Sequence, residues 1–386
     1  MDDKQGFVMQ IEQCRWQKEK GWGKGKLPGS LKDAQLVLFF SSKEILDEGA
    51  LINGLKTSYP QAEIVGCTNE GQILGGEVTD HALVVTAIHF EHSSVVVVSQ
   101  AVDDTAKSEE LGVSLIQKLP AEGLRHVFAL GDGSHLAGSS LAKGISSHLS
   151  PGIGVTGGFT PPNHRVYHNA TLPNGAAVLV GLYGDKLQFS YAARTGWKSY
   201  GPIRKITKSQ GEVLYELDNK PALDFYKEFL GPFANELPGI GLNYPMLVWG
   251  PHSDQTTAIA RTVVAVDENE KSLRCAGDLP EGYNVQFMIT NNEMIVQGAA
   301  TAAKLSLEAM QHTKPELALL MTCVSRKMMM KQRIEEEVEA VSDVLGENVK
   351  YTGFYTWGEI TPLNFNDTCA FQNQVMAITA IREVGN

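Results

Sequence analysis

Short apolar stretches of strand length recur along this chain, and they constrain its fold more than any other feature of the sequence. Residues 34–42 read AQLVLFFSS, residues 93–101 read SSVVVVSQA, and residues 316–325 read ELALLMTCVS. Such runs are typical of buried strands and are too short to cross a bilayer. Between them lie segments with apolar residues at helical spacing, such as residues 104–119 and 332–345. The alternation predicts the α/β (mixed α+β) class, with mixed β-sheets flanked by helices.

The length of the chain, 386 residues, predicts more than one hydrophobic core. We expect an irregular lead-in segment over residues 1–33, because this stretch is polar and rich in lysine and glycine. A first domain is expected over residues 34–221 and a second over residues 222–386, since the mixed pattern of strands and helices starts again there. Two similar halves remain an open alternative.

Composition excludes several classes of function. The net charge is −11, which argues against nucleic acid as a partner and against a polybasic membrane anchor. The acidic start of the chain does not read as a signal peptide, so we expect a cytoplasmic protein that does not bind membranes. The five cysteines are widely spaced without a C-x-x-C motif, a pattern that favours free thiols over disulfides or zinc.

Residues 156–170 read TGGFTPPNHRVYHNA and place His164 and His168 four residues apart. On a helix, this spacing would allow both imidazoles to bind one metal ion. Two prolines before His164 and β-type residues between the histidines favour a strand instead, and LPNG at residues 172–175 predicts a hairpin turn after it. On a strand the two side chains lie roughly 13 Å apart, at about 3.3 Å per residue. We therefore expect each histidine to act alone.

Three other segments carry polar or reactive side chains next to the end of an expected strand, where α/β proteins bind ligands. They are GCTNEG at residues 66–71, TCVSR at residues 322–326 and GFYTWGE at residues 353–359. The candidate ligand-pocket residues are Cys67, Thr68, Asn69, Glu70, Cys323, Arg326, Tyr355, Trp357 and Glu359. Each has a structural alternative: Cys67 as a small buried apolar residue, Arg326 as a surface arginine, and the aromatic residues as ordinary packing.

These segments, together with GVTGG, LDNKPALDFYKEFLG, YPMLV and AGDLPEGYNVQF, resemble the FIST family. They occur in the order of the family, and the resemblance extends from about Ala34 to Ile381. The first half resembles the FIST N-terminal domain and the second half the FIST C-terminal domain. The lead-in CRWQKEKGW resembles the NosP-type subgroup of stand-alone haem proteins.

The resemblance implies a stand-alone small-ligand sensor, and the subgroup implies one that binds b-type haem, detects nitric oxide and regulates a histidine kinase linked to biofilm and cyclic-di-GMP signalling. A homodimer is left open. His164 is the first candidate for the axial iron ligand and His168 the second, with His89 and His252 as further alternatives. Gly157, Gly158 and Phe159 would then belong to the loop of the haem pocket.

Two rival functions are kept. One is a sensor of an amino acid or another small polar metabolite. In that case, the side chains that hold the charged groups of the ligand would be those of Cys67, Asn69, Glu70, Arg326 and Glu359. The other is an enzyme, which the sequence disfavours because it contains no recognisable nucleophile–base pair or metal set.

Overall fold

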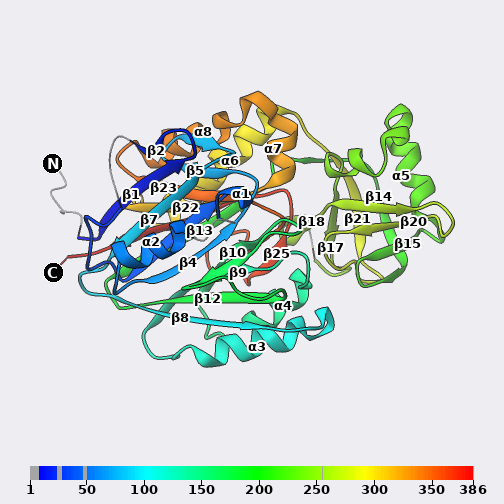
Figure 1. The fold of residues 1–386 in the computed structure, drawn as a ribbon. Helices are drawn as coiled ribbons and strands as arrows, with labels where there is room; N and C mark the ends of the chain where they lie inside the picture. Colours follow the sequence, from blue (N-terminus) through cyan, green and yellow to red (C-terminus); the bar gives the residue numbers. More distant parts are fainter. Residues whose placement is uncertain (1–7, 24–27, 47–49, 254, 386) are drawn as a thin grey trace.

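The computed structural model describes residues 8–23, 28–46, 50–253 and 255–385. They form a body of three six-stranded mixed sheets and a smaller unit that lies to one side of it (Figure 1). The expected mixed α/β class is confirmed. Within the described residues, we find no helix with the length and apolar content needed to cross a membrane.

Each sheet of the body contains one pair of parallel strands near its centre. In order across the sheet, the first sheet comprises β11 (Val166–His168), β4 (Glu63–Thr68), β3 (Leu36–Ser41), β7 (Leu83–His89), β1 (Gln10–Gln17) and β2 (Gly21–Trp22). The second sheet comprises β25 (Ala370–Gln372), β24 (Glu359–Thr361), β10 (Gly154–Phe159), β9 (Leu124–Gly131), β12 (Ala176–Tyr183) and β8 (Ser94–Ala101). The third sheet comprises β13 (Leu187–Arg194), β26 (Met376–Glu383), β22 (Leu317–Cys323), β23 (Lys350–Thr356), β5 (Gln72–Leu74) and β6 (Glu77–Thr79).

The three sheets repeat one topology. The parallel pairs are β3–β4, β9–β10 and β22–β23, and each pair is followed in the chain by short strands that leave for a neighbouring sheet. Thus β5–β6 join the third sheet, β11 joins the first, and β24–β25 join the second. The chain then returns as an antiparallel strand, β7, β12 or β26, beside the first strand of the pair. The repeat is therefore threefold rather than the twofold repeat that the sequence left open.

A glycine marks the same position in each repeat. Gly66, Gly157 and Gly353 each lie fourth in the second parallel strand. A Cβ atom at these positions would lie 2.2, 1.8 and 1.9 Å from a backbone carbonyl oxygen of the strand alongside. No side chain fits at such a distance, so the close approach of the two parallel strands requires glycine.

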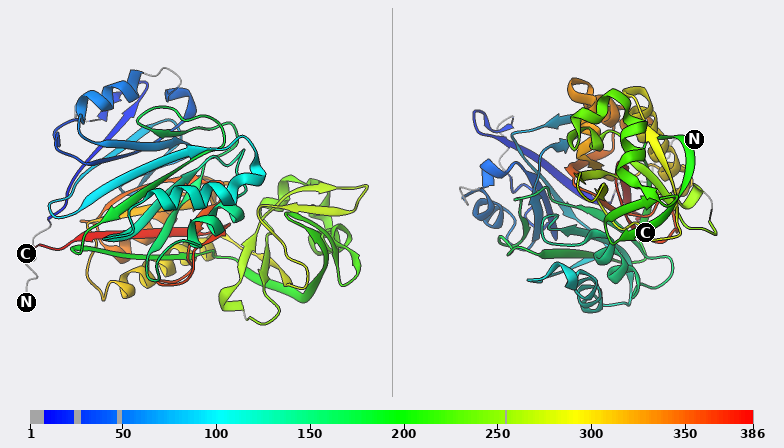
Figure 2. Two further views of the ribbon diagram at one scale, coloured as in Figure 1. Left: turned by 90° about the horizontal axis from the view of Figure 1, so that it is seen from below. Right: turned by 90° about the vertical axis from the view of Figure 1, so that its right-hand side faces the viewer.

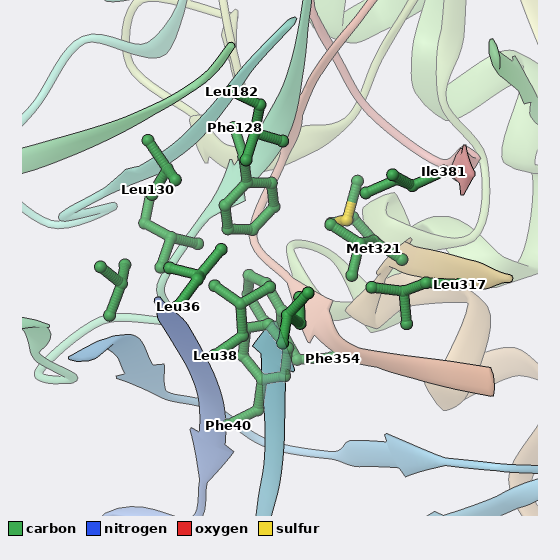
Figure 3. Close-up of a cluster of buried hydrophobic side chains, with 14 of the residues drawn as sticks. Leu36, Leu38, Phe40, Phe128, Leu130, Leu182, Leu317, Met321, Phe354 and Ile381 are labelled. Carbon is green, nitrogen blue, oxygen red and sulfur yellow. The ribbon is translucent and has the colours of Figure 1, made fainter. Parts of the chain in front are cut away.

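The core lies where the inner faces of the three sheets meet (Figure 3). Alternate residues of the first parallel strand point inward, as the period of a strand requires. Among them are Leu38 and Phe40 of β3, Phe128 of β9 and Met321 of β22, all nearly inaccessible to solvent. Burial of each such side chain contributes about 1.5–3 kcal/mol.

Helices cover the outer faces of the sheets. The helices are α1 (Lys43–Leu46) and α2 (Ala50–Ser58) on the first sheet, α3 (Ser108–Lys118) and α4 (Gly138–Ser146) on the second, and α6 (Asn292–Ala309), α7 (Val324–Met330) and α8 (Glu335–Leu345) with the third. Separate apolar clusters lie between the sheets and these helices.

Residues 198–289 form the smaller unit, which has its own apolar cluster (Figure 2). Its elements are β14 (Lys198–Gln210), β15 (Val213–Leu217), β16 (Lys220–Pro221), α5 (Ala222–Leu230), β17 (Met246–Trp249), β18 (Ile259–Arg261), β19 (Val263–Asp267), β20 (Ser272–Cys275) and β21 (Asn284–Ile289). The expected domain boundary after residue 221 falls inside this unit, between β16 and α5. Strands from both sides of that boundary also share the third sheet, where β13 pairs with β26.

Two local expectations are wrong. The described part of the lead-in is not irregular, because β1 pairs with β7 over seven residues and closes the edge of the first sheet. The predicted hairpin across LPNG does not form either: β11 pairs with β4, whereas β12 pairs with β8 and β9. In both cases the partner strand is distant in sequence, so local patterns do not reveal it.

Candidate ligand-binding residues

The topology brings the predicted loops together at one end of the body. In each repeat the loop that follows the second parallel strand leads into a strand of the neighbouring sheet. Cys67 accordingly pairs with Val166, and Gly158 pairs with Glu359. The segments around residues 66–71, 156–168 and 353–359 therefore hold equivalent places in the fold, although the chain separates them by about 90 to 200 residues.

The first loop is held mainly by its own polar side chains. Cys67 is fully buried in the central core, and burial raises the pKa of its thiol, so it is not poised as a nucleophile. The Thr68 hydroxyl accepts a hydrogen bond from the backbone N–H of Arg165 at 2.8 Å. Asn69 Oδ1 accepts from the Gly71 N–H at 3.2 Å and from Gln72 Nε2 at 2.9 Å. Of the four candidates in this loop, Glu70 alone is exposed.

The double glycine and Phe159 do not form a pocket loop. Gly157 and Gly158 lie within β10, paired on both sides, and are fully buried. The ring of Phe159 points toward the helices outside the second sheet and meets Phe371 edge-on, with 5.3 Å between ring centroids. Their expected place in a haem pocket is therefore corrected to a structural one.

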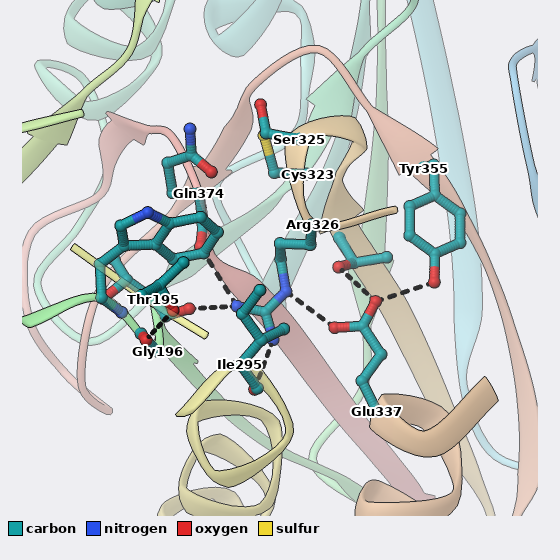
Figure 4. A network of polar contacts seen from close by, with 12 residues as sticks. Thr195, Gly196, Ile295, Cys323, Ser325, Arg326, Glu337, Tyr355 and Gln374 are labelled. Atoms are coloured by element: carbon teal, nitrogen blue, oxygen red, sulfur yellow. Dashed lines mark hydrogen bonds and ion pairs between the residues drawn. The ribbon is translucent and has the colours of Figure 1, made fainter. Parts of the chain in front are cut away.

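Arg326 is neither exposed nor free to bind a ligand. Its Nε donates to Glu337 Oε2 at 2.8 Å, and the other nitrogens donate to backbone carbonyls of Thr195, Ile295 and Gln374 (Figure 4). Both partners of the ion pair have fully buried side chains. The expected carboxylate clamp is thus occupied by a carboxylate of the chain itself, which ties α7 to α8 and to the third sheet.

Tyr355 belongs to the same network. Its hydroxyl donates to Glu337 Oε1 at 2.8 Å, and the pKa of Tyr355 is raised by burial and by that carboxylate. Trp357 in the next turn is partly exposed. Of these two aromatic candidates, Trp357 is the one that solvent can reach.

Glu359 is a fully buried carboxyl group. Its Oε1 accepts from the Thr356 hydroxyl. Its Oε2 has no close hydrogen-bond partner among the described residues, although the Val375 N–H and the Cys323 thiol lie near enough to the carboxyl to oppose the rise in its pKa. Burial raises the pKa of Glu359 to about 8, so the group holds its proton at neutral pH. Cys323 lies beside it, and burial together with that carboxyl raises the pKa of the thiol to about 12.

The two histidines differ in what their nitrogens do. His168 Nε2 lies 3.0 Å from Glu63 Oε2, and its Nδ1 lies 2.9 Å from the Ser99 hydroxyl, so both nitrogens are engaged. His164 precedes β11 and is half-buried, and its Nδ1 is buried without a hydrogen-bond partner among the described residues. Burial lowers the pKa of His164; nearby Lys43 adds to this change, whereas Glu70, a backbone hydrogen bond with Thr68, and Glu44 oppose it. The imidazole is therefore neutral at pH 7.

A surface pocket of about 410 Å³ lies between the lead-in strands and α1, and His164 is not among the residues that line it. Glu44, which interacts electrostatically with His164, lines this pocket and accepts a hydrogen bond from His81 Nδ1 at 2.9 Å. Trp16 and Ile45 supply apolar surface to the pocket, and Lys18 and Lys20 lie at its border. None of these lining residues was expected from the sequence: Trp16, Lys18 and Lys20 belong to the lead-in, which had been interpreted as irregular, and Glu44, Ile45 and His81 belong to no motif that was singled out.

Sequence reasoning also missed His126 on β9. This histidine is fully buried, its Nε2 lies 2.8 Å from the Thr156 hydroxyl, and its Nδ1 has no partner in the described part of the chain. Burial lowers its pKa to about 3. Residues 125–130 read RHVFAL, and a histidine next to such an apolar run was the available signal. The described residues contain no cluster of three or more His, Cys, Asp or Glu side chains that could hold a metal ion.

Comparison with known proteins identifies the family. Residues 35–220 match the family described as the FIST N domain, and residues 222–362 match the FIST C domain. The chain belongs to the FIST family. FIST domains are small-ligand-sensing domains, and the role of a sensor follows from this membership.

Two individual proteins are similar to this FIST protein. The uncharacterized protein MJ1623 of Methanocaldococcus jannaschii is 23% identical over 218 residues, which are 52% of this chain and 42% of that protein. The match thus spans less than half the length of this relative. A crystal structure of a chorismatase is similar over 97% of this chain and 99% of its own, with 8% sequence identity and a TM-score of 0.36.

For a haem in this FIST protein, the donor chemistry fits at one of the two expected histidines. His164 offers a neutral imidazole with an unpaired nitrogen, as an iron ligand requires. His168 could ligate iron only by giving up a bond to Glu63 or Ser99. Phe159 faces another part of the core, so Trp16 and Ile45 of the neighbouring pocket would have to supply the apolar wall.

Proposed function

We propose that this FIST protein is a haem-based sensor of nitric oxide, in which His164 is the axial ligand. The observation that carries the proposal is the unpaired Nδ1 of a neutral, half-buried imidazole. A buried polar atom without a partner is costly, and ligation of iron would remove that cost. The iron would supply the coordination position at which nitric oxide binds.

The pocket lined by Glu44, which interacts electrostatically with His164, supports the same ligand. Trp16 and Ile45 can cover a flat apolar ring, and Lys18 and Lys20 can pair with its propionate groups. Glu70 and Lys43, both close enough to influence the pKa of His164, can couple its protonation to the loops that follow β4 and β3. Haem binding at His164 would thus change the electrostatic environment at the ends of β3 and β4 in the first sheet.

The signal requires a partner, and we propose a histidine kinase or another two-component protein that acts on biofilm and cyclic-di-GMP signalling. A cytoplasmic location, a homodimer and the absence of an enzymatic activity belong to the same proposal. Co-purification of the haem-loaded and haem-free protein with a panel of histidine kinases would test the partner.

Absorption spectroscopy of the purified protein tests haem binding. Addition of haem should give a Soret band that shifts when nitric oxide is added, and His164→Ala should abolish or displace that band. His168→Gln is the matched control, because both nitrogens of His168 already have partners. An unchanged Soret band in His164→Ala would refute the ligand assignment. A protein that takes up no haem would refute the whole proposal.

One observation favours the alternative sensor of a small polar metabolite. Glu359 is buried and protonated at neutral pH, so its carboxyl group can donate a hydrogen bond to a ligand. Cys67, Asn69 and Arg326 no longer support this alternative, since their side chains are buried or engaged within the protein. A colourless protein whose melting temperature rises with an amino acid, and does not rise in Glu359→Gln, would favour it.

A further inference from the structure

The threefold repeat creates three equivalent seams between the sheets. In each seam, the outer strand of one sheet lies against the start of the parallel pair of the next sheet. These strands are β8 and β13, which are outermost in their sheets, and β1, beyond which only the two-residue β2 pairs. Strands β8, β13 and β1 face the first, second and third sheets respectively, through contacts that involve Ser99, Phe189 and Met9. A side chain that differs at one of the three equivalent seams therefore distinguishes that seam from the other two.

Two of the seams are filled by side chains. At the seam of β8, His168 bridges Ser99 and Glu63 with hydrogen bonds of 2.9 and 3.0 Å. At the seam of β1, Glu316 Oε1 accepts from the Met9 N–H at 3.1 Å, and a pocket of only about 130 Å³ remains. The seam of β1 thus leaves little room for a ligand, and the side chain of His168 occupies the seam of β8.

The third seam, at β13, is open. A pocket of about 490 Å³ lies between β13, the starts of β9 and β10, and the end of α6. Three aromatic rings line it: Phe189, Tyr191 and Phe365. The rings of Tyr191 and Phe365 lie 4.9 Å apart, and Phe365 is 37% exposed although it is a large apolar residue. Tyr191 itself is buried, so Phe365 and the partly exposed Phe189 are the aromatic rings that a ligand can reach, as at many binding surfaces.

The residue behind these rings departs from the repeat. Where the first and third sheets have Leu36 and Leu317 at the start of the first parallel strand, the second sheet has His126. Its ring stacks on Phe189 with 4.9 Å between centroids, and its Nδ1 has no partner among the described residues. A fully buried histidine in place of leucine costs stability, and such a cost is usually found at a functional site.

Charge selects the class of ligand. Arg125, one residue before His126, is exposed and lines the same pocket. It takes part in none of the ion pairs found between described residues. A guanidinium at the border of an aromatic wall suits a ring compound that carries a carboxylate or a similar anionic group.

We propose that the seam between β13 and the second sheet binds a flat ring compound with an anionic substituent. The ring stacks against Phe365 and Phe189, the anionic group pairs with Arg125, and the buried rings of Tyr191 and His126 hold those two aromatic side chains in place. This site is separate from His164 and does not depend on haem. The site gives the sensor a second ligand, which is bound between the second and the third sheets.

Titration of the haem-free protein with naphthalene-2-carboxylate tests the proposal, with the neutral naphthalene-2-carboxamide as the comparison probe. We expect saturable binding of the carboxylate, measured by isothermal titration calorimetry, and at least tenfold weaker binding of the carboxamide. Phe365→Ala should weaken both probes at least tenfold. Arg125→Met should weaken the carboxylate about tenfold, so that the two probes then bind alike. Absence of saturable carboxylate binding to the unaltered protein overturns the proposal.

Control variants distinguish binding at this site from non-specific binding to exposed aromatic residues and from binding at the haem site. Tyr200→Ala removes another exposed aromatic ring, on the smaller unit, and should leave both titrations unchanged. His164→Ala should also leave them unchanged, whereas it should alter the Soret band. His126→Leu introduces the residue found in the other two repeats and should weaken binding at least fivefold. Equal binding by Phe365→Ala and the unaltered protein refutes the site, even if His126→Leu fails to fold.

Discussion

Replacement of Arg326 by methionine is the most direct test of the interpretation that this residue stabilises the fold and does not bind a ligand. The guanidinium is fully buried and has Glu337 Oε2 at 2.8 Å and two carbonyl oxygens at 3.0 and 3.2 Å among its acceptors. Its removal leaves the Glu337 carboxylate buried, with the hydroxyls of Tyr355 at 2.8 Å and Thr322 at 3.3 Å as its remaining partners.

The expected cost follows from that uncompensated charge. Breaking a buried ion pair from one side costs about 3–5 kcal/mol, because the remaining charge has lost its counter-charge without regaining water. Methionine replaces part of the lost volume, so the cost arises mainly from electrostatics and from the lost hydrogen bonds. We therefore expect the free energy of unfolding of Arg326→Met to fall by about 3–5 kcal/mol.

Urea unfolding, monitored by tryptophan fluorescence, measures this change. The buried Trp197 lies close to the network, and its indole N–H donates a hydrogen bond to the Asn243 carbonyl oxygen. The double variant Arg326→Met with Glu337→Met should be less destabilised than the sum of the single variants, by about 1–3 kcal/mol. A loss below about 1 kcal/mol in Arg326→Met, or strictly additive effects, would refute the reasoning. Arg326 would then be a candidate ligand residue again.

Three further predictions rest on single residues. Gly353→Ala should prevent folding to soluble protein, because its Cβ would lie 1.9 Å from a carbonyl oxygen, whereas Gly76→Ala, with open space around it, should express normally. Burial raises the pKa of Glu359 from its ordinary value of 4.5 to about 8, so the native state keeps a proton that the unfolded chain releases. Stability should therefore fall as pH rises from about 4.5 to 8, and melting curves of Glu359→Gln should lack that component; an identical pH profile would contradict it. Cys67 should not react with Ellman's reagent in the native protein but should react in urea, because burial raises the pKa of its thiol; rapid native labelling identified at Cys67 would show that the loop opens.

The location of the candidate site could be predicted in part from the sequence. Cys67 pairs with Val166 and Gly158 pairs with Glu359, so the segments around residues 66–71, 156–168 and 353–359 hold equivalent places in the fold, although Gly157 and Gly158 lie within β10 rather than in a loop. The roles of individual side chains could not be predicted. Cys67 and Arg326 look equally reactive in the sequence, and only their burial and partners show that one fills the core and the other pairs with Glu337.

The histidines His164, His168 and His126 also show that the roles of individual side chains could not be predicted from the sequence. The sequence ranked His164 above His168, but the reason became visible only when Glu63 and Ser99 were found beside the nitrogens of His168. His126 received no rank, although it is one of the described histidines with a buried unpaired nitrogen. A ligand site depends on which polar atoms are left without partners, and those partners come from distant parts of the chain.

The sequence by itself determined the class of the fold, because the period of apolar residues decides locally between strand and helix. It also determined the family, through motifs that occur in a fixed order. The tertiary structure decided how strands pair between repeats, and therefore that the body is a threefold arrangement in which β5, β11 and β24 cross to neighbouring sheets. Strand pairing joins residues through backbone hydrogen bonds, which every residue except proline can donate, so side-chain patterns carry little information about the partner. The open seam beside His126 is a consequence of that pairing.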